Sequence, residues 1–176
     1  MHGKSLTGRF VYPIFCLVFL TFGAMTVARA ATVIVAFGAS NTVGKNGASY
    51  PAELEVLLNN KGYNVRVINA GANGDTTADM LARVDSVVPS DARLVLVSAA
   101  TPNDRKAGIL SKQKQYLAQI LGKLKARGIR VLVLPPLSSL ARRSTADPAH
   151  YDPVGYRAIA SALMPRVAAA LGPPTR

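Results

Sequence analysis

Four short runs of consecutive apolar residues, separated by segments of helical periodicity, constrain the fold of this chain more than any other feature. The runs cover residues 31–37, 64–69, 93–98 and 129–134. Such continuous runs are typical of strands buried on both faces, which occur in parallel sheets covered by helices. Because each run is followed by a helical segment, the chain is predicted to be α/β, with a small parallel sheet flanked by helices in three layers and joined by right-handed crossovers.

The helical segments begin at recognisable capping residues, which are Ser49 for the first helix, Asp75 or Thr76 for the second, and Asp152 for the last. The third helix is predicted as one element over residues 108–127. No repeat, low-complexity tract or interdomain linker interrupts this alternation, so a single domain is expected over residues 31–176.

The first 30 residues have a different composition. Lys4 and Arg9 precede an apolar stretch over residues 10–27, and Ala28-Arg29-Ala30-Ala31 provides small residues at the spacing of a signal-peptidase site. We therefore predict a cleavable signal peptide over residues 1–30, cut after Ala30, and a periplasmic or secreted product. The alternative is that the stretch is retained as a membrane anchor.

Cleavage would limit the kinds of catalytic and metal-binding site that the product can form. It removes the single cysteine, Cys16, and one of the two histidines, which leaves His150 as the only imidazole. A domain without cysteine has no disulfide, no cysteine-based zinc site and no thiol nucleophile. One histidine also excludes a site with several histidine ligands, so neither a metal nor another cofactor is expected.

Small and reactive residues follow each predicted strand. The carboxyl ends of parallel strands meet at one edge of the sheet, where such folds bind their ligands. Ser40 follows the first strand, Gly71 the second, Asn103 the third, and Asp147 with His150 the fourth. The sequence thus predicts that these residues converge at one edge.

This set of residues suits acyl transfer. A serine hydroxyl needs an adjacent base to remove its proton, and His150 is the histidine available to Ser40. Asp147, three residues before His150, is placed to orient the ring through one tight turn. The Ser40 amide, the Gly71 amide and the Asn103 side chain could donate hydrogen bonds to an oxyanion.

The sequence resembles the SGNH (GDSL-type) serine hydrolases, with similarity from residue 36 to residue 156. In detail it is similar to short exported bacterial lysophospholipases and arylesterases. The resemblance implies a flavodoxin-like sheet, Ser40 as nucleophile, and His150 and Asp147 as base and orienting acid. It also implies an oxyanion hole formed by Ser40, Gly71 and Asn103, in an esterase, lipase or thioesterase that works through an acyl-enzyme.

Three departures from the family pattern bear on these expectations. The usual Gly-Asp-Ser reads Gly38-Ala39-Ser40, and Thr101-Pro102 precedes Asn103 where the family has a glycine two residues before its asparagine. Only about a dozen residues separate the fourth strand from Asp147, which predicts a minimal sheet and an open, shallow substrate site. The Gly-x-Ser-x-Gly motif of the α/β-hydrolases is absent because Thr42 occupies its last position.

Other interpretations remain open at this point. Ser40 and Gly71 can be turn residues, Asn103 can cap a helix, and Asp152 competes with Asp147 as the partner of His150. At the level of function, the alternatives to an esterase are a glycan O-deacetylase and a non-catalytic ligand-binding module on the same sheet.

The charge gives weaker information about partners. Cleavage after Ala30 leaves 18 Lys and Arg against nine Asp and Glu, a formal charge of +9. The basic residues are scattered and tryptophan is absent, which disfavours nucleic-acid binding. A solvated basic surface is the plain interpretation, and attraction to anionic envelope lipids is the alternative. Four cations in the predicted active-edge loops could also steer an anionic substrate; they are Arg105, Lys106, Arg142 and Arg143.

Overall fold

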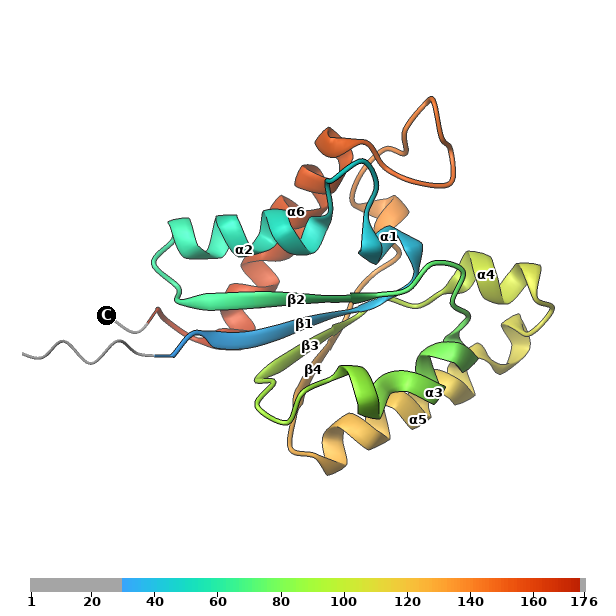
Figure 1. The fold of residues 1–176 in the computed structure, drawn as a ribbon, viewed down its shortest axis with the longest axis horizontal. Coiled ribbons are helices and arrows are strands. Elements are labelled where there is room, and N and C mark those ends of the chain that lie inside the picture. The colour runs from blue at the N-terminus through green and yellow to red at the C-terminus, as the bar shows by residue number, and fades with distance from the viewer. Residues whose placement is uncertain (1–29, 175–176) are drawn as a thin grey trace, which may run out of the picture.

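A computed structural model describes residues 30–174, so the predicted signal peptide lies outside the described residues apart from Ala30. Four parallel strands form one sheet in the order β2-β1-β3-β4 (Figure 1). The strands are β1 (Thr32–Gly38), β2 (Val65–Gly71), β3 (Leu94–Val97) and β4 (Arg130–Val133). The α/β class and the four-stranded parallel sheet are as predicted.

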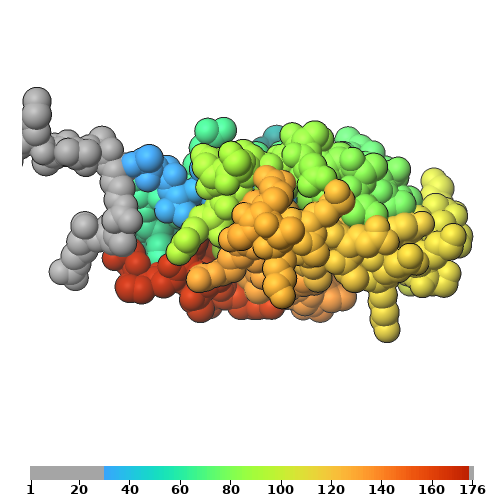
Figure 2. Space-filling view, turned by 90° about the horizontal axis from the view of Figure 1, so that it is seen from below, coloured from blue at the N-terminus to red at the C-terminus, as the bar shows by residue number. Residues whose placement is uncertain are grey.

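Helices cover both faces of the sheet and complete the three layers. One face carries α2 (Tyr50–Asn60) and α6 (Pro153–Leu171), and the other carries α3 (Thr77–Val87) and α5 (Gln113–Ala126) (Figure 1). Figure 2 shows the second face, where α3 and α5 lie over the sheet. The strands alternate between two separate cores, because Ile34 and Ala36 pack under α2 and α6 whereas Val35 and Phe37 pack under α3 and α5.

The two edge strands differ from the prediction of full burial on both faces. Arg66 and Asn69 of β2 are exposed, and β4 is exposed at Arg130 and Val133. Strands β1 and β3 have neighbours on both sides, so their apolar runs are buried almost throughout. The four runs have similar sequences, but two of them form the central strands of the sheet and two form its edge strands.

The predicted third helix is interrupted. Gly108, expected at its start, has φ +70° and separates the short helix α4 (Thr101–Lys106) from a 3₁₀ turn (Leu110–Lys112) that leads into α5. The region around Asn103, expected to be a loop, is therefore helical. Pro102 fits there because it lies in the first turn of α4, where its missing N–H is not needed.

Two capping predictions are confirmed in atomic detail. The side chain of Thr76 accepts a hydrogen bond from the Asp79 N–H, and Asp79 bonds back to Thr76 in a capping box at the start of α3. Asp152 Oδ1 accepts from Gly155 N–H at 2.8 Å and caps α6. Ser49 precedes α2 as predicted, but its side chain forms no capping hydrogen bond.

The order of the strands creates a crevice. The chain passes from β1 to β2 on one side and then returns to β3 on the other side of β1. At such a reversal the connections leave the carboxyl ends of the two central strands in opposite directions. The short helix α1 (Ser40–Val43) follows β1 and α4 follows β3, so both border this crevice. Within residues 30–174, no helix is long and apolar enough to cross a membrane.

Candidate active site

Ser40 is the first residue of α1, immediately beyond the carboxyl end of β1. The close packing of the end of β1 against α1 requires glycine at position 38, because a Cβ there would lie 2.3 Å from Thr42 Oγ1. Ala39 is extended, and the chain then turns at once into α1. Within residues 30–174, no acceptor bonds the Ser40 N–H, which lies in the first turn of this helix. Both the hydroxyl and the amide of Ser40 are thus presented at the crevice.

Asn69 fixes the position of α1, a role that sequence reasoning missed. Its side-chain amide donates to the carbonyl oxygens of Thr42 at 2.8 Å and Val43 at 3.1 Å. These are carbonyls at the end of α1, which a four-residue helix cannot satisfy internally. The signal available in the sequence was a polar residue inside a predicted buried strand.

Gly71 has a different role from the one predicted. Its N–H donates to Asn69 Oδ1 at 3.0 Å, and the residue does not line the crevice. A Cβ at Gly71 would lie 2.4 Å from Val43 N, so glycine is needed here for the close approach of β2 to α1. Because its amide is already bonded, the structure does not place Gly71 among the oxyanion donors.

Asp147 and His150 are brought together by a tight turn, as their spacing predicted. Asp147 Oδ2 lies 2.8 Å from His150 Nδ1. The backbone of the same turn supports the pair, since His150 N–H donates to Asp147 O at 3.0 Å and Ala149 N–H to Asp147 Oδ1 at 3.1 Å. Asp152, the competing carboxylate, is occupied in capping α6.

A third side chain, Lys45, joins the pair. Its ammonium contacts Asp147 Oδ2, the same oxygen that contacts His150. A hydrogen bond from Lys45, which has the larger effect, and a second one from His150 hold the pKa of the Asp147 carboxyl well below its usual range. The carboxylate therefore stays ionised wherever a histidine base would work.

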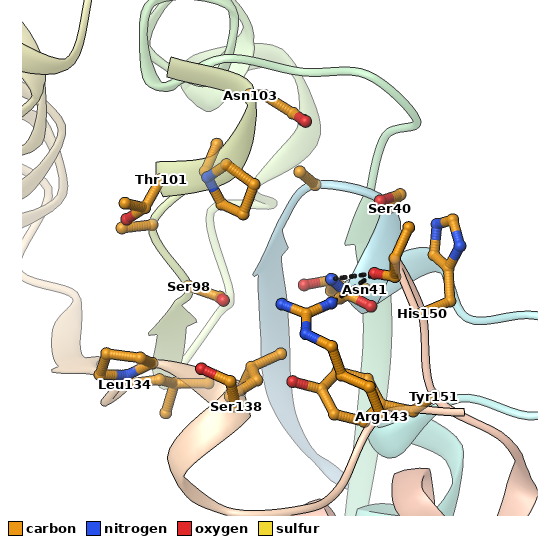
Figure 3. A pocket seen from close by; sticks show the side chains of 18 of the residues that line it. Ser40, Asn41, Ser98, Thr101, Asn103, Leu134, Ser138, Arg143, His150 and Tyr151 are labelled. Atoms are coloured by element: carbon orange, nitrogen blue, oxygen red, sulfur yellow. Dashed lines mark hydrogen bonds between the residues drawn. The ribbon is translucent and has the colours of Figure 1, made fainter. Parts of the chain in front are cut away.

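Ser40 and His150 lie on opposing loops that touch each other. The Asn41 side chain donates to Ala149 O at 3.4 Å, which joins the residue after Ser40 to the residue before His150. Ser40 and His150 both line the pocket, and Figure 3 shows them from close by. Among the described residues no hydrogen bond joins their side chains.

Asn103 lies across the crevice on α4. Its Nδ2 donates to Asp75 O at 2.6 Å, and an amide nitrogen carries a second hydrogen that this bond does not use. Asp75 ends the turn that contains Gly74, at φ +78°. Like Gly71, Gly74 is not among the residues that line the cavity, but no acceptor within the described part of the chain bonds its N–H. The Gly74 N–H is therefore an open backbone donor in the turn that Asn103 contacts through Asp75.

Ser40, Asn103 and His150 line one cavity of about 750 Å³. Residues 134–137 add two leucines and two prolines to its lining. Arg105 and Arg143 also line it, whereas neither Asp nor Glu is among its lining residues. Residues 30–174 contain no group of three or more His, Cys, Asp or Glu placed to hold a metal ion.

Comparison with known proteins agrees with this geometry. The model of the GDSL-like lipase/acylhydrolase family matches residues 36–174, which is most of the chain. The chain belongs to this family. The crystal structure of AlinE4, an SGNH-hydrolase family esterase, matches with a TM-score of 0.59 and 30% identity, over 82% of this chain and 98% of that one.

Two further relatives match over a shorter segment or at lower sequence identity. Esterase TesA of Pseudomonas aeruginosa is 36% identical over 84 residues, which are 47% of this chain and 42% of TesA. The match thus spans less than half the length of this relative. A carbohydrate acetylesterase family member from Sinorhizobium meliloti has a TM-score of 0.57 at 16% identity, over 80% of this chain and 99% of that one, and at that identity shows the fold alone.

Proposed function

We propose that this family member is a serine ester hydrolase with Ser40 as nucleophile, His150 as general base and Asp147 as the acid that orients His150. The observation that carries the proposal is the 2.8 Å Asp147–His150 pair on a loop that touches the residue after Ser40. In a histidine whose Nδ1–H is held by a carboxylate, Nε2 is free to accept a proton.

The reaction follows from these positions. Ser40 Oγ attacks the ester carbonyl carbon while its proton passes to His150 Nε2, and the resulting tetrahedral intermediate carries a negative oxygen. His150 then gives the proton to the departing alcohol, and the carbon–oxygen bond of the ester breaks. Water attacks the acyl-enzyme in the same way, with His150 taking its proton, and releases the carboxylic acid and Ser40.

Donors for the negative oxygen come from two sides of the crevice. The Ser40 N–H and the second hydrogen of the Asn103 amide supply two of them, and the Gly74 N–H supplies a third. Each such donor is worth about a hundredfold or more in rate when it is aimed at the oxyanion. Asp147 keeps the His150 tautomer fixed and stabilises the imidazolium formed in each half-reaction.

The cavity suits esters of short or medium acyl chains, including aryl esters and lysophospholipids. Residues 134–137 provide an apolar wall, and a cavity of about 750 Å³ holds a small ester but not a long extended chain with its alcohol. Both leucines of this wall are themselves buried, so the wall is fixed by the core.

The test is turnover of 4-nitrophenyl acetate and butyrate together with labelling by a fluorophosphonate probe. Wild-type protein should hydrolyse both esters and become labelled, and S40A should lose labelling and at least a thousandfold in kcat. S90A is the matched control, because Ser90 lies in an exposed turn before β3, at the opposite edge of the sheet. Folded wild-type protein that is neither labelled nor active would support the ligand-binding alternative instead.

A further inference from the structure

The cavity carries two arginines that the hydrolytic mechanism does not use. We propose that they form an anion subsite, so that the natural substrate is an ester bearing a carboxylate or phosphate group near the scissile bond. Arg143 is the principal residue of this subsite and Arg105 adds a second positive charge. The inference rests on the proposed esterase function and specifies its substrate class.

Arg143 is held close to the reacting groups. Its guanidinium donates to Ala149 O at 2.5 Å, the same carbonyl that Asn41 bonds, so it lies one residue from His150 on one side and from Ser40 on the other. Its Cζ also lies 5.3 Å from the centroid of the buried Tyr151 ring. Figure 3 shows the side chain reaching into the pocket between Asn41 and Tyr151. The guanidinium is therefore preorganised, which reduces the entropy lost when a ligand binds.

Most of its hydrogen-bonding capacity remains open. A guanidinium has five N–H donors, and one of those on Arg143 is engaged by Ala149 O. Three arginines of the described chain pair with carboxylates: Arg83 with Asp75, Arg127 with Asp85, and Arg157 with Glu53. Within residues 30–174, neither Arg143 nor Arg105 forms an ion pair, although both line the cavity.

The electrostatic surroundings favour an anion. No Asp or Glu lines the cavity, and the nearest catalytic carboxylate, Asp147, has its charge countered by Lys45. A partly desolvated arginine with open donors binds a carboxylate or phosphate through two parallel hydrogen bonds. The open N–H donors of Arg143 have no anionic partner among the described residues, and a substrate anion would supply one.

The structure also distinguishes these arginines from their neighbours in sequence. Arg142 and Lys106 do not line the cavity, although each adjoins a residue that does. Arg105 is exposed like them but lines the cavity, and Arg143 is half-buried. General attraction by surface charge would involve all four cations equally. A subsite would involve Arg143 and Arg105 alone, and this difference provides the control.

The experiment compares charged esters with neutral esters of matched length. One pair tests the acyl side, with the 4-nitrophenyl monoester of adipic acid against 4-nitrophenyl methyl adipate. The other tests the alcohol side, with 4-acetoxybenzoate against methyl 4-acetoxybenzoate. For each pair the charged-to-neutral ratio of kcat/KM is measured in wild type, R143Q, R105Q and R142Q at low salt and at high salt.

We expect wild type to favour the charged member of one pair, and which pair it is tells which side of the ester carries the anion. R143Q should lower that ratio about tenfold, R105Q by a smaller factor, and R142Q should leave it unchanged. Added salt should lower the wild-type ratio more than the R143Q ratio. R143K should restore part of the ratio, because it keeps the charge but not the two parallel hydrogen bonds.

The subsite is refuted if wild type shows no preference for a charged ester in either pair, or if R143Q and R142Q lower the ratio equally. Because the measure is a ratio within each variant, a general loss of activity in R143Q does not mimic the expected result. Failure of the esterase proposal itself looks different, since then neither the charged nor the neutral esters are hydrolysed in a Ser40-dependent manner.

Discussion

A single oxygen atom, Asp147 Oδ2, contacts both the His150 ring and the Lys45 ammonium. The orienting acid of the proposed triad is therefore shared with a cation that lies 102 residues away along the chain. A positive charge on the acid weakens its pull on the imidazolium, because the carboxylate charge is partly compensated. Lys45 also helps to keep Asp147 ionised while it shares the carboxylate oxygen with His150.

Replacing Lys45 by Gln should raise the pKa of the Asp147 carboxyl toward its usual range, because the Lys45 hydrogen bond is the largest cause that lowers it. Asp147 should then lose its charge at a higher pH in K45Q than in wild type. We expect the carboxyl titration of Asp147, followed by 13C NMR, to move upward by about half a pH unit or more, since the Lys45 side chain is 42% exposed and solvent screens its charge.

K61Q provides the control, because it removes the same charge from the exposed end of α2. The cations of the His150 loop itself, Arg142 and Arg143, are unchanged in both variants. An Asp147 titration that stays in place in K45Q, or moves downward, would contradict the proposed role of Lys45.

At the residue scale, a contact of the site could be predicted only where its two residues lie close together in the sequence. Asp147 and His150 are three residues apart, so a local turn sufficed to predict their contact. Lys45 was missed because no local pattern links it to Asp147. The hydrogen bond from the Gly71 N–H to Asn69 Oδ1 was also not predictable, because Asn69 is positioned by the packing of β2 on α1.

At the scale of elements, Asp104 joins three helices in the layer that carries Asn103. It is fully buried, and accepts hydrogen bonds from Thr77 N–H at 2.7 Å, Thr77 Oγ1 at 2.6 Å and Gln113 Nε2 at 2.6 Å. The Thr77 N–H is the first of α3, so the positive end of that helix faces the carboxylate. This carboxylate ties α4 to the first residues of α3 and α5.

Replacing Asp104 by Asn should destabilise the fold. The new NH₂ group faces the donors of Thr77 or Gln113, so at least one buried donor loses its acceptor, at a cost of about 2 kcal/mol. For a domain of this size we expect a fall in Tm of roughly 6 °C, measured by thermal unfolding. D91N, which removes a charge from an exposed turn, should change Tm by about a degree or less.

D104N should also lower kcat more than it raises KM, because Asn103 is the adjacent residue on α4 and its donor acts on the transition state. Equal stability of D104N and D91N would show that the three hydrogen bonds do not hold α4 in place.

The boundaries of the elements were predictable where the chain carries a stop or a cap, as at Thr76 and Asp152. They were not predictable around α4. The sequence from Thr101 to Lys106 has too few apolar residues to show helical periodicity, and it becomes helical because Asp104 is buried between α3 and α5. Tertiary contacts, rather than local propensity, define this element.

At the scale of the whole molecule, the family resemblance and the β-α alternation predict the same site, because both place the functional loops at the carboxyl edge of the sheet. The order β2-β1-β3-β4 places the β1 and β3 loops next to each other, and these loops carry Ser40 and Asn103. The alternation alone predicted that the loops share an edge. It could not predict which strands are neighbours, because several orders satisfy the same right-handed crossovers.

The folded unit also bears on the proposed processing of the chain. Thr32 N–H donates to Asn64 O at 2.8 Å and begins the sheet, whereas Ala31 before it is exposed. A cut between Ala30 and Ala31 therefore falls before the first residue of β1 and leaves the Thr32–Asn64 hydrogen bond in place. We propose that the chain is exported and cut at this bond, releasing the domain intact.

Expression of the full chain in a bacterium with a Sec pathway, followed by fractionation, tests this proposal. N-terminal sequencing and intact mass of the periplasmic or secreted product should show a chain beginning at Ala31. Signal peptidases require small side chains at the residue before the cut and two residues earlier, so A30R should leave an uncut precursor in the membrane fraction. A28S, which keeps a small side chain, should still be cut. Wild-type protein that retains residues 1–30 would instead establish the apolar stretch as an anchor, with the active domain held at the membrane surface.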